Sequence, residues 1–262
     1  MINKYVLITG GTQGIGLELA KIFAKNGHNL IIVARHENEL AKAKINLEAF
    51  GVEVITIAKD LFNPHAAFEL YRQTTDRNLL VNILVNNAGQ GLYGLFENTD
   101  IDRELAIVQL NISSTIVLTK LYLQDMLVQG DGRVLNLSSI ASKAPGPWQS
   151  VYHGTKAFVQ SFTEALRSEV KEKGIVVTAL LPGATDTDFF NKANMTESKA
   201  VQDKSKLADP ADVAEAGYNA LMNDEDMVVA GFKNKMNVAM SNIMPDSIAA
   251  DNMKNSQKPA EQ

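Results

Sequence analysis

A glycine-rich turn between an apolar run and a helical pattern constrains the fold of this chain more than any other feature. The apolar run Tyr5–Thr9 has the composition of a buried strand, and the helical pattern Leu17–Asn26 follows the turn. The turn itself carries Gly10, Gly14 and Gly16. A strand that leads through such a turn into a helix gathers backbone N–H groups at a helix N-terminus, which attracts a pyrophosphate. The segment therefore predicts a dinucleotide-binding α/β fold.

The rest of the chain alternates between short apolar runs and longer helical patterns such as Glu37–Phe50. The further candidate strands are Leu30–Val33, Val54–Ala58, Ile83–Asn86, Val134–Leu137, Val176–Leu181 and Met227–Val229. Most are continuously apolar, as in strands that helices cover on both faces. We predict an α/β, doubly wound Rossmann fold whose mostly parallel, seven-stranded sheet carries helices on both faces.

Length and composition narrow the domain count and the class of protein. The 262 residues suffice for one large domain, for which we predict residues 1–254 with a C-terminal helical extension over 231–254. The polar segment Asn255–Gln262 contains Pro259 and is expected to be a disordered tail. The 25 basic and 30 acidic residues give a formal charge of −5, which argues against nucleic acid as a partner. With no cysteine and four scattered histidines, no metal site is expected.

The termini and the hydropathy pattern bear on location. Met1–Lys4 runs directly into the first strand pattern and lacks the features of a secretory signal. No apolar run of the sequence approaches the roughly 20 residues that span a bilayer. We therefore expect a cytoplasmic protein without stable membrane insertion.

Two residues near the start of a later helical pattern carry acid–base chemistry. Tyr152 and Lys156 lie four residues apart, so their side chains share one helix face. A free phenol has a pKa of about 10, too high for easy proton exchange near neutrality. An adjacent ammonium, together with the positive charge of an oxidised nicotinamide, is expected to lower that pKa. Ser139 ends the fifth apolar run thirteen residues earlier and could bind a carbonyl oxygen, with Ser138 as a rival.

The order of these motifs resembles the short-chain dehydrogenase/reductase family, in its branch of short, single-domain enzymes. The resemblance covers about Tyr5 to Val229 and includes the glycine turn, the segment Asn86–Gly89 and the pair Tyr152 and Lys156. It implies an oxidoreductase in which Asn111, Ser139, Tyr152 and Lys156 are the catalytic residues. Asn111 would organise a water-linked proton path to the lysine, and Lys156 would also bind the ribose.

The same resemblance, added to the turn chemistry, implies the cofactor site. Asp60 would contact the adenine amino group, and Thr185 and Thr187 would hold the nicotinamide carboxamide. The full set is Gly10, Thr12, Gln13, Gly14, Ile15, Gly16, Arg35, Asp60, Leu61, Asn87, Ala88, Gly89, Tyr152, Lys156, Pro182, Gly183, Thr185 and Thr187. Ala34 stands where an acidic residue would select NADH, and the guanidinium of Arg35 suits a 2′-phosphate, so NADP(H) is expected over NAD(H). The hydroxyl of Thr12 could add a contact there, whereas Gln13 stands where the family often has a second cation.

Substrate candidates follow the fourth, fifth and sixth strands. They are Gln90, Tyr93, Ala141, Trp148, Gln149, Phe189, Phe190 and Met195, although the aromatic side chains could equally belong to the core. This mainly apolar set, without Arg or Lys, predicts a neutral and fairly hydrophobic ketone or aldehyde. The segment Phe189–Lys206 is expected to form a short helix that acts as a lid.

The function predicted is that of an NADPH-dependent carbonyl reductase, which could also run as an alcohol dehydrogenase. One alternative is a reductase of 3-oxoacyl thioesters, although no basic patch for an acidic carrier is obvious. Another is a sensor or scaffold that binds NADP(H) without turnover, against which the four intact catalytic residues count.

Two helical patterns predict assembly of several copies. The pattern Asp102–Leu127 is apolar over more than one face, and Val151–Lys171 carries a stripe that includes Phe158 and Phe162. Because one face suffices to cover a sheet, we expect a homotetramer or homodimer that pairs these helices, as the resemblance also implies. Farther along, Met236, Met240 and Met244 recur every four residues with Ile243 alongside, and a second helical pattern covers Ser247–Met253. This segment could pack over the substrate site, contact another subunit or lie on a membrane surface.

Overall fold

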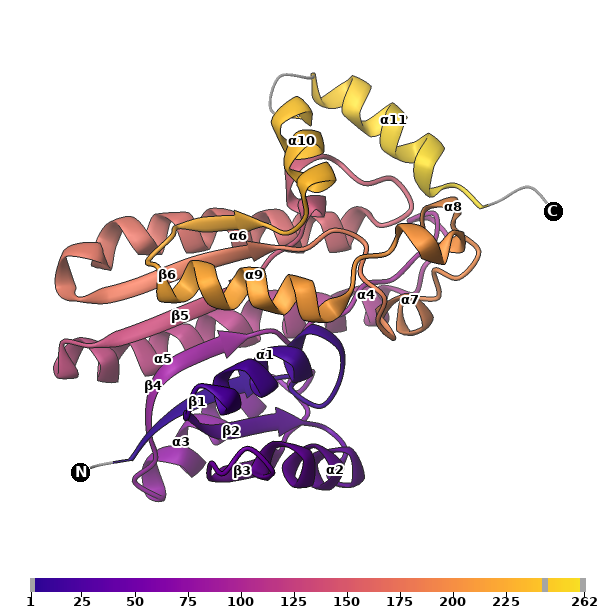
Figure 1. Ribbon diagram of the computed structural model, residues 1–262. Coiled ribbons are helices and arrows are strands. Elements are labelled where there is room, and N and C mark those ends of the chain that lie inside the picture. The colour runs from indigo at the N-terminus through magenta and orange to yellow at the C-terminus, as the bar shows by residue number, and fades with distance from the viewer. Residues whose placement is uncertain (1–2, 242–244, 260–262) are drawn as a thin grey trace.

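A parallel sheet organises the chain in a computed structural model that describes residues 3–241 and 245–259 (Figure 1). Its strands are β1 (Lys4–Thr9), β2 (Asn29–Ala34), β3 (Val54–Ala58), β4 (Leu80–Asn86), β5 (Gly132–Leu137), β6 (Ile175–Leu181) and β7 (Met227–Val229). They lie in the order β3-β2-β1-β4-β5-β6-β7, with every neighbouring pair parallel. The chain reverses its winding between β1 and β4, which is where a doubly wound sheet opens a ligand crevice.

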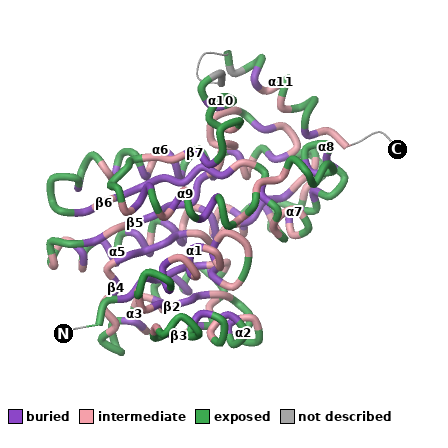
Figure 2. The backbone as a smooth tube through the Cα atoms, viewed as in Figure 1, coloured by how far each residue is buried: buried purple, intermediate pink, exposed green. Residues whose placement is uncertain are grey.

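Helices cover both faces of this sheet, and the buried residues concentrate between the layers (Figure 2). One face is covered by α1 (Gly14–Lys25), α2 (Glu37–Glu48) and α9 (Pro210–Met222). The other is covered by α3 (Ala66–Asp76), α5 (Ser114–Gln129) and α6 (Ser150–Val170). Along β1, Ile8 packs with the first set and Leu7 with the second, so both strand faces are apolar. The predicted doubly wound α/β fold is confirmed.

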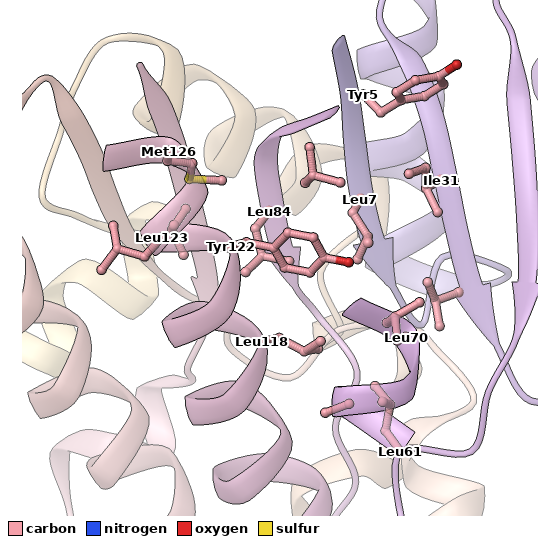
Figure 3. Packing of buried hydrophobic residues seen from close by; sticks show 14 of the residues in the cluster. Tyr5, Leu7, Ile31, Leu61, Leu70, Leu84, Leu118, Tyr122, Leu123 and Met126 are labelled. Carbon is pink, nitrogen blue, oxygen red and sulfur yellow. The ribbon is translucent and has the colours of Figure 1, made fainter. Parts of the chain in front are cut away.

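The core beneath α5 shows how a polar group is accommodated between these layers (Figure 3). The ring of Tyr122 belongs to the same buried cluster as Leu84 of β4, and its hydroxyl is 2.8 Å from the hydroxyl of Thr74 on α3. Burial raises the pKa of Tyr122 well above its ordinary value, with the Thr74 hydrogen bond acting in the opposite direction. The hydroxyl therefore stays a neutral, paired group that links α3 to α5.

A long helix that begins after β4 departs from the sequence expectation in one respect. It comprises α4 (Ile101–Val108), a π-helical turn at Gln109–Ser113, and α5. Over Ile101–Gln129 it is long and apolar enough to cross a membrane by length and composition alone, whereas no segment of that kind was expected. The core helix of a soluble protein has the same character, and 44% of its most apolar window is buried inside the fold.

The segment expected to form one lid helix is instead divided into short pieces. It contains α7 (Phe189–Lys192), α8 (Lys199–Gln202) and a 3-10 turn at Lys204–Lys206. The backbone between α7 and α8 turns through Asn194, whose φ of 55° ends the first helix. A small apolar cluster of Ala193, Met195 and Val201 holds these pieces together.

The C-terminal region differs from the expected disordered tail as far as residue 259, and residues 260–262 of that tail lie outside the described residues. Helix α10 spans Phe232–Ser241 and α11 spans Asp246–Gln257, so residues 255–257 continue a helix. Pro259 pairs with Ser198, and Figure 1 shows α11 lying beside α8. Contacts with distant residues order a segment whose composition alone suggested disorder. Met244 and Ile243 of the predicted methionine pattern lie outside the described residues.

The close approach of α1 to β1 depends on a glycine. A Cβ atom at Gly16 would lie 2.3 Å from both the Gly10 carbonyl oxygen and Asn87 Nδ2. We expect Gly16→Ala to lower the free energy of unfolding by about 1–3 kcal/mol, because the turn must move. Gly154 is the matched control, since a Cβ there meets nothing within 4 Å on helix α6. In urea unfolding, Gly154→Ala should raise the free energy of unfolding by about 0.5–1 kcal/mol. Equal effects of the two substitutions on this free energy would contradict the packing argument.

Candidate active site

One cavity of about 470 Å³ runs from the glycine turn to the C-terminal helix α11. It lies at the carboxyl ends of the strands, where the topology of the sheet predicts a ligand crevice. Every residue of the predicted cofactor set except Gly16 lines it. Gly16 instead permits the close packing of α1 described above. The fold therefore brings the dispersed sequence motifs together around a single space.

The glycine turn has the backbone geometry that a phosphate site needs. Gly10 and Gly14 have φ values of 67° and 54°, in the left-handed region that favours glycine. Helix α1 begins at Gly14 with no side-chain cap and no acidic residue in its first turn. Its first N–H groups are thus left for another partner, and the helix dipole favours a negative one. These features fit the pyrophosphate of a dinucleotide.

Asn86 and Asn87 brace the floor of the cavity. The Asn86 amide donates to Asn136 Oδ1 at 2.8 Å and to Thr119 Oγ1 at 2.9 Å, which ties β4 to β5 and α5. The Asn87 amide donates to the carbonyl oxygens of Thr9 and Gly10 at 2.8 and 3.0 Å. The side-chain NH₂ groups of both residues therefore hold the scaffold together. Asn87 still lines the cavity, and so do Ala88 and Gly89, whose small size keeps it open.

Tyr152, Lys156 and Ser139 come together on one wall. Helix α6 presents Tyr152 and Lys156, with the Lys156 ammonium 5.8 Å from the centre of the tyrosine ring. Lys156 is only 6% exposed, and its Nζ donates to the carbonyl oxygen of Leu137 at 2.8 Å. Ser139 extends the same strand end into the cavity. Its rival Ser138 also lines the cavity, but it is buried and its hydroxyl donates to the Lys156 carbonyl oxygen at 2.8 Å.

The pKa of Tyr152 differs from the expected depression. Burial raises the pKa of Tyr152 to about 12, against which a hydrogen bond with Ser139 acts. Burial also lowers the pKa of Lys156 to about 8. Desolvation disfavours the charged form of each group, and it is the largest cause of both shifts. The expected lowering therefore depends on the positive nicotinamide, and the phenol is a protonated donor at neutral pH.

Asn111 is positioned by the π-helical turn between α4 and α5. Its Oδ1 accepts from Gln90 N at 3.0 Å, while its Nδ2 donates to Gln90 O and to Thr155 Oγ1, each at 2.9 Å. A Cβ at Gly89 would lie 3.3 Å from Asn111 Oδ1 and 3.2 Å from Lys156 Nζ. Asn111 therefore lies behind Gly89 and close to the lysine, outside the cavity lining. A π-turn of this kind often marks a functional site.

The opposite end of the cavity contains a cation and an unexpected carboxylate. Arg35 is exposed, and its guanidinium lies 5.5 Å from the centre of the Phe62 ring. Among the residues that the structure describes, no carboxylate forms an ion pair with Arg35. The Thr12 hydroxyl, expected to face a phosphate, donates instead to Glu39 Oε2 at 3.2 Å. Glu39 lines this end as well, and sequence patterns gave no sign of it because its approach depends on how α2 packs.

The loop after β6 closes the cavity beside the glycine turn. Thr185 pairs with Ala208, and the Asp186 amide donates to the Ala208 carbonyl at 2.9 Å, which fixes the loop against the start of α9. A Cβ at Gly14 would lie 2.9 Å from Thr187 Cγ2. The loop and the turn therefore approach each other across the space assigned to the cofactor, as expected if Thr185 and Thr187 hold its nicotinamide end.

The substrate side combines predicted and unpredicted residues. Of the predicted set, Gln90, Ala141, Gln149, Phe189, Phe190 and Met195 line the cavity. Tyr93 and Trp148 do not: their rings stack behind the wall with centres 5.5 Å apart. His153, Ser256 and Gln257 also line it without having been predicted, whereas Met253 lines it as expected if the pattern Ser247–Met253 packs over the substrate site. Met253, Ser256 and Gln257 belong to α11, so of the three alternatives for the C-terminal segment its packing over the substrate site is the one that the structure shows.

The chain is similar in sequence to known dehydrogenases and reductases. The family profile described as "short chain dehydrogenase" matches residues 4–198. The chain is 29% identical over 257 residues to a protein named ketoacyl reductase HetN from a Nostoc species, covering 95% of this chain and 88% of that protein. It is 35% identical over 187 residues to a very-long-chain 3-oxoacyl-CoA reductase from Rattus norvegicus, covering 69% of this chain and 59% of that protein.

A solved structure extends the likeness over the whole fold. The short-chain dehydrogenase from Sphingobium yanoikuyae in complex with NADPH superposes with a TM-score of 0.82 at 25% identity. The match covers 99% of this chain and 98% of that one. The similarity thus includes the C-terminal helices beyond the residues that the family profile reaches.

Proposed function

The chain belongs to the short-chain dehydrogenase family, and from this premise we propose that it is an NADPH-dependent carbonyl reductase. The substrate class proposed is a neutral, fairly hydrophobic ketone or aldehyde. One observation carries the proposal: Ser139, Tyr152 and Lys156 share a wall of the same cavity that the glycine turn and the loop at Thr185 and Thr187 enclose. A site with both a dinucleotide cradle and a proton donor suits an oxidoreductase.

The residues of the wall would act on the carbonyl oxygen. When bound, the reduced nicotinamide supplies the hydrogen and electron pair that the carbonyl carbon accepts. The hydroxyls of Ser139 and Tyr152 would hold the carbonyl oxygen by hydrogen bonds and polarise it. Tyr152 would then donate its proton to that oxygen, which yields the alcohol. The high pKa of the buried phenol suits this direction, because the proton is present at neutral pH.

Lys156 and Asn111 would support the proton transfer. The Lys156 ammonium lies on the same helix face as Tyr152 and stabilises negative charge on the phenol oxygen once the proton has left. Gly89 leaves the space beside Lys156 Nζ free, so the ammonium can also bind a ribose hydroxyl. Asn111, anchored to Gln90 and Thr155, would order water between the lysine and solvent.

The preference for NADPH over NADH is part of the proposal. Two features support it: no carboxylate among the described residues pairs with the guanidinium of Arg35, which follows β2, and Ala34 stands where an acidic residue would repel a 2′-phosphate. Glu39 opposes it through its negative charge, so a moderate preference is expected. The proposal also includes a cytoplasmic location, which rests on sequence composition.

A substrate screen tests the function directly. Purified protein would be incubated with NADPH and a panel of hydrophobic ketones, aldehydes and a 3-oxoacyl thioester, with loss of nicotinamide absorbance as the readout. Turnover of neutral ketones supports the proposal. Tight NADPH binding without turnover of any compound would favour a sensor or scaffold instead.

A second candidate is reduction of 3-oxoacyl thioesters. The names of two relatives favour it, since both describe reductases of ketoacyl or 3-oxoacyl compounds. The two candidates share the catalytic wall and differ in how the carbonyl is delivered. A kcat/KM for the thioester at least tenfold above that for every free ketone would select this candidate.

The exposed apolar surface of α4, α5 and α6 supports a homotetramer or homodimer. Leu105 of α4 is 58% exposed. Phe158 of α6 is 38% exposed, although the stripe to which it belongs was expected to form one buried face of that helix. We predict that Leu105→Glu with Phe158→Asp reduces the mass in light scattering to the 28.6 kDa monomer. Ile45→Glu, on α2 across the sheet, is the control and should leave the assembly intact. A wild-type monomer would contradict the proposal.

A further inference from the structure

The segment that leaves the loop after β6 lies across the cavity. It comprises residues 187–193, which we call the strap, and it contains α7. At one end, Thr187 Cγ2 lies close to the glycine turn after β1, 2.9 Å from where a Cβ at Gly14 would be. At the other end, the Ala193 carbonyl oxygen accepts from the Tyr93 N–H, in the loop after β4, at 2.8 Å. Because the crevice opens between β1 and β4, the strap spans the space in which a dinucleotide would lie.

The side chain of Arg103 joins the strap to two other parts of the cavity wall. Asp100 caps α4 and accepts from Arg103 N at 3.1 Å, which fixes the arginine in the first turn of that helix. Arg103 Nη2 donates to Gln90 Oε1 at 2.7 Å and to the Lys192 carbonyl oxygen at 3.5 Å, where α4 and α7 meet (Figure 1). The guanidinium also lies 5.7 Å from the centre of the Phe62 ring. All three partners line the cavity, whereas Arg103 itself does not, so it holds the wall from behind.

Gln90 connects this guanidinium to the scaffold of the catalytic wall. The Gln90 N–H donates to Asn111 Oδ1 at 3.0 Å, and the Gln90 carbonyl oxygen accepts from Asn111 Nδ2 at 2.9 Å. Within the described part of the chain, no carboxylate forms an ion pair with Arg103, so its fixed fork of N–H donors serves neutral acceptors. A continuous path of hydrogen bonds therefore runs from the strap through Arg103 and Gln90 to the π-helical turn.

We infer that Arg103 is a positioning residue that holds the strap closed over a bound dinucleotide and so slows its release. The inference rests on the proposed function, because it takes a nicotinamide dinucleotide as the occupant of the cavity. A strap that spans the crevice must move before a molecule beneath it can leave, and such opening steps often limit release. Since Arg103 acts from behind the wall, it should retain NADH and NADPH equally. Arg35, which lines the cavity, would instead discriminate between them.

The test measures the rate constant of cofactor release, koff. Protein loaded with NADPH or with NADH is mixed rapidly with an excess of the oxidised cofactor, and the loss of bound nicotinamide fluorescence gives koff. Arg103→Met keeps an unbranched side chain and removes the donors. We expect it to raise koff by roughly three- to tenfold, the effect of one lost hydrogen bond, and by the same factor for both cofactors. Because koff is a property of the folded, loaded protein, a loss of global stability alone does not change it.

A second variant removes the other partner of the same hydrogen bond. Gln90→Met takes away the acceptor for Arg103 and leaves the backbone bonds to Asn111 in place. It should raise koff in the wild-type background and have no further effect in the Arg103→Met background, because both changes break one path. Arg72→Met is the matched control, since it removes an exposed guanidinium from α3 and should leave koff unchanged.

The possible outcomes separate this inference from the proposed function. An unchanged koff in Arg103→Met overturns the inference. An increase confined to NADPH overturns it as well, because it would show that Arg103 acts on the 2′-phosphate. If Arg103→Met does not fold, Gln90→Met decides alone: an unchanged koff contradicts the inference, and an equal increase for both cofactors supports it. If the wild type binds neither cofactor, the proposed function itself fails and the inference fails with it.

Discussion

Tyr152→Phe is expected to abolish carbonyl reduction while leaving NADPH affinity nearly unchanged. The change removes one oxygen atom, and with it the proton donor of the proposed site, but little surface that contacts a dinucleotide. We expect kcat to fall by at least two to three orders of magnitude, roughly the contribution of general acid catalysis. Single-turnover kinetics with a reducible ketone gives kcat, and titration of NADPH fluorescence gives affinity.

Lys156→Ala provides the comparison for this variant. It removes the charge beside Tyr152 and also the group proposed to bind ribose, so both kcat and NADPH affinity should fall. Equal effects of the two variants on affinity would contradict the division of roles between them. A Tyr152→Phe enzyme that retained more than about a tenth of wild-type kcat would exclude the tyrosine as the acid.

The pKa values of Tyr152 and Lys156 predict how the rate of reduction by the wild type, measured as kcat against pH, depends on pH. Because burial raises the pKa of the phenol to about 12, the proton donor is present throughout the neutral range. Reduction by the wild type should therefore not be lost through the phenol as pH rises from 6 to 8, and should decline only as pH approaches that value. The buried Lys156, with a pKa of about 8, loses its charge earlier and is expected to set the first decline.

Most of the fold could be predicted from the sequence because it depends on local patterns. The continuous apolar character of β1 and β4, with the glycine turn after β1, implies a sheet covered on both faces. The backbone requirement at Gly10 is local too, since a positive φ there favours glycine. Tyr152 and Lys156 needed only helical spacing to share a face.

Residue patterns predicted less wherever burial or the docking of one element on another decides the outcome. The segment at 255–257 is polar, yet it is helical because Gln257 is bonded to Tyr93 and Ser198, residues far away in the chain. The phenol pKa was expected to be lowered by a neighbouring charge, whereas desolvation raises it. Glu39 approaches Thr12 only through the packing of α2. Such effects depend on distances between elements, which residue patterns do not encode.

Replacing Ala34-Arg35 by Asp-Ile is expected to reverse the cofactor preference from NADPH to NADH. The substitution removes the guanidinium that would face a 2′-phosphate and adds a carboxylate that would repel it and accept from the ribose hydroxyls. Loss of one charged hydrogen bond, about 1.5–3 kcal/mol, corresponds to a decrease of roughly 10–150-fold in kcat/KM for NADPH. Parallel kinetics with both cofactors and one ketone gives the ratio.

Glu39→Gln is the matched variant at the same end of the cavity, and it should act in the opposite direction. It keeps an acceptor for the Thr12 hydroxyl, which lies 3.2 Å from Glu39 Oε2, and removes only the negative charge. Because that charge repels a 2′-phosphate while an uncharged ribose hydroxyl is little affected, the variant should strengthen the preference for NADPH. High salt should reduce the effect, since the charges are partly exposed to solvent. A wild-type protein that uses NADH as well as NADPH would contradict the role proposed for Arg35, and an unchanged ratio in Glu39→Gln would show that the carboxylate does not face the phosphate.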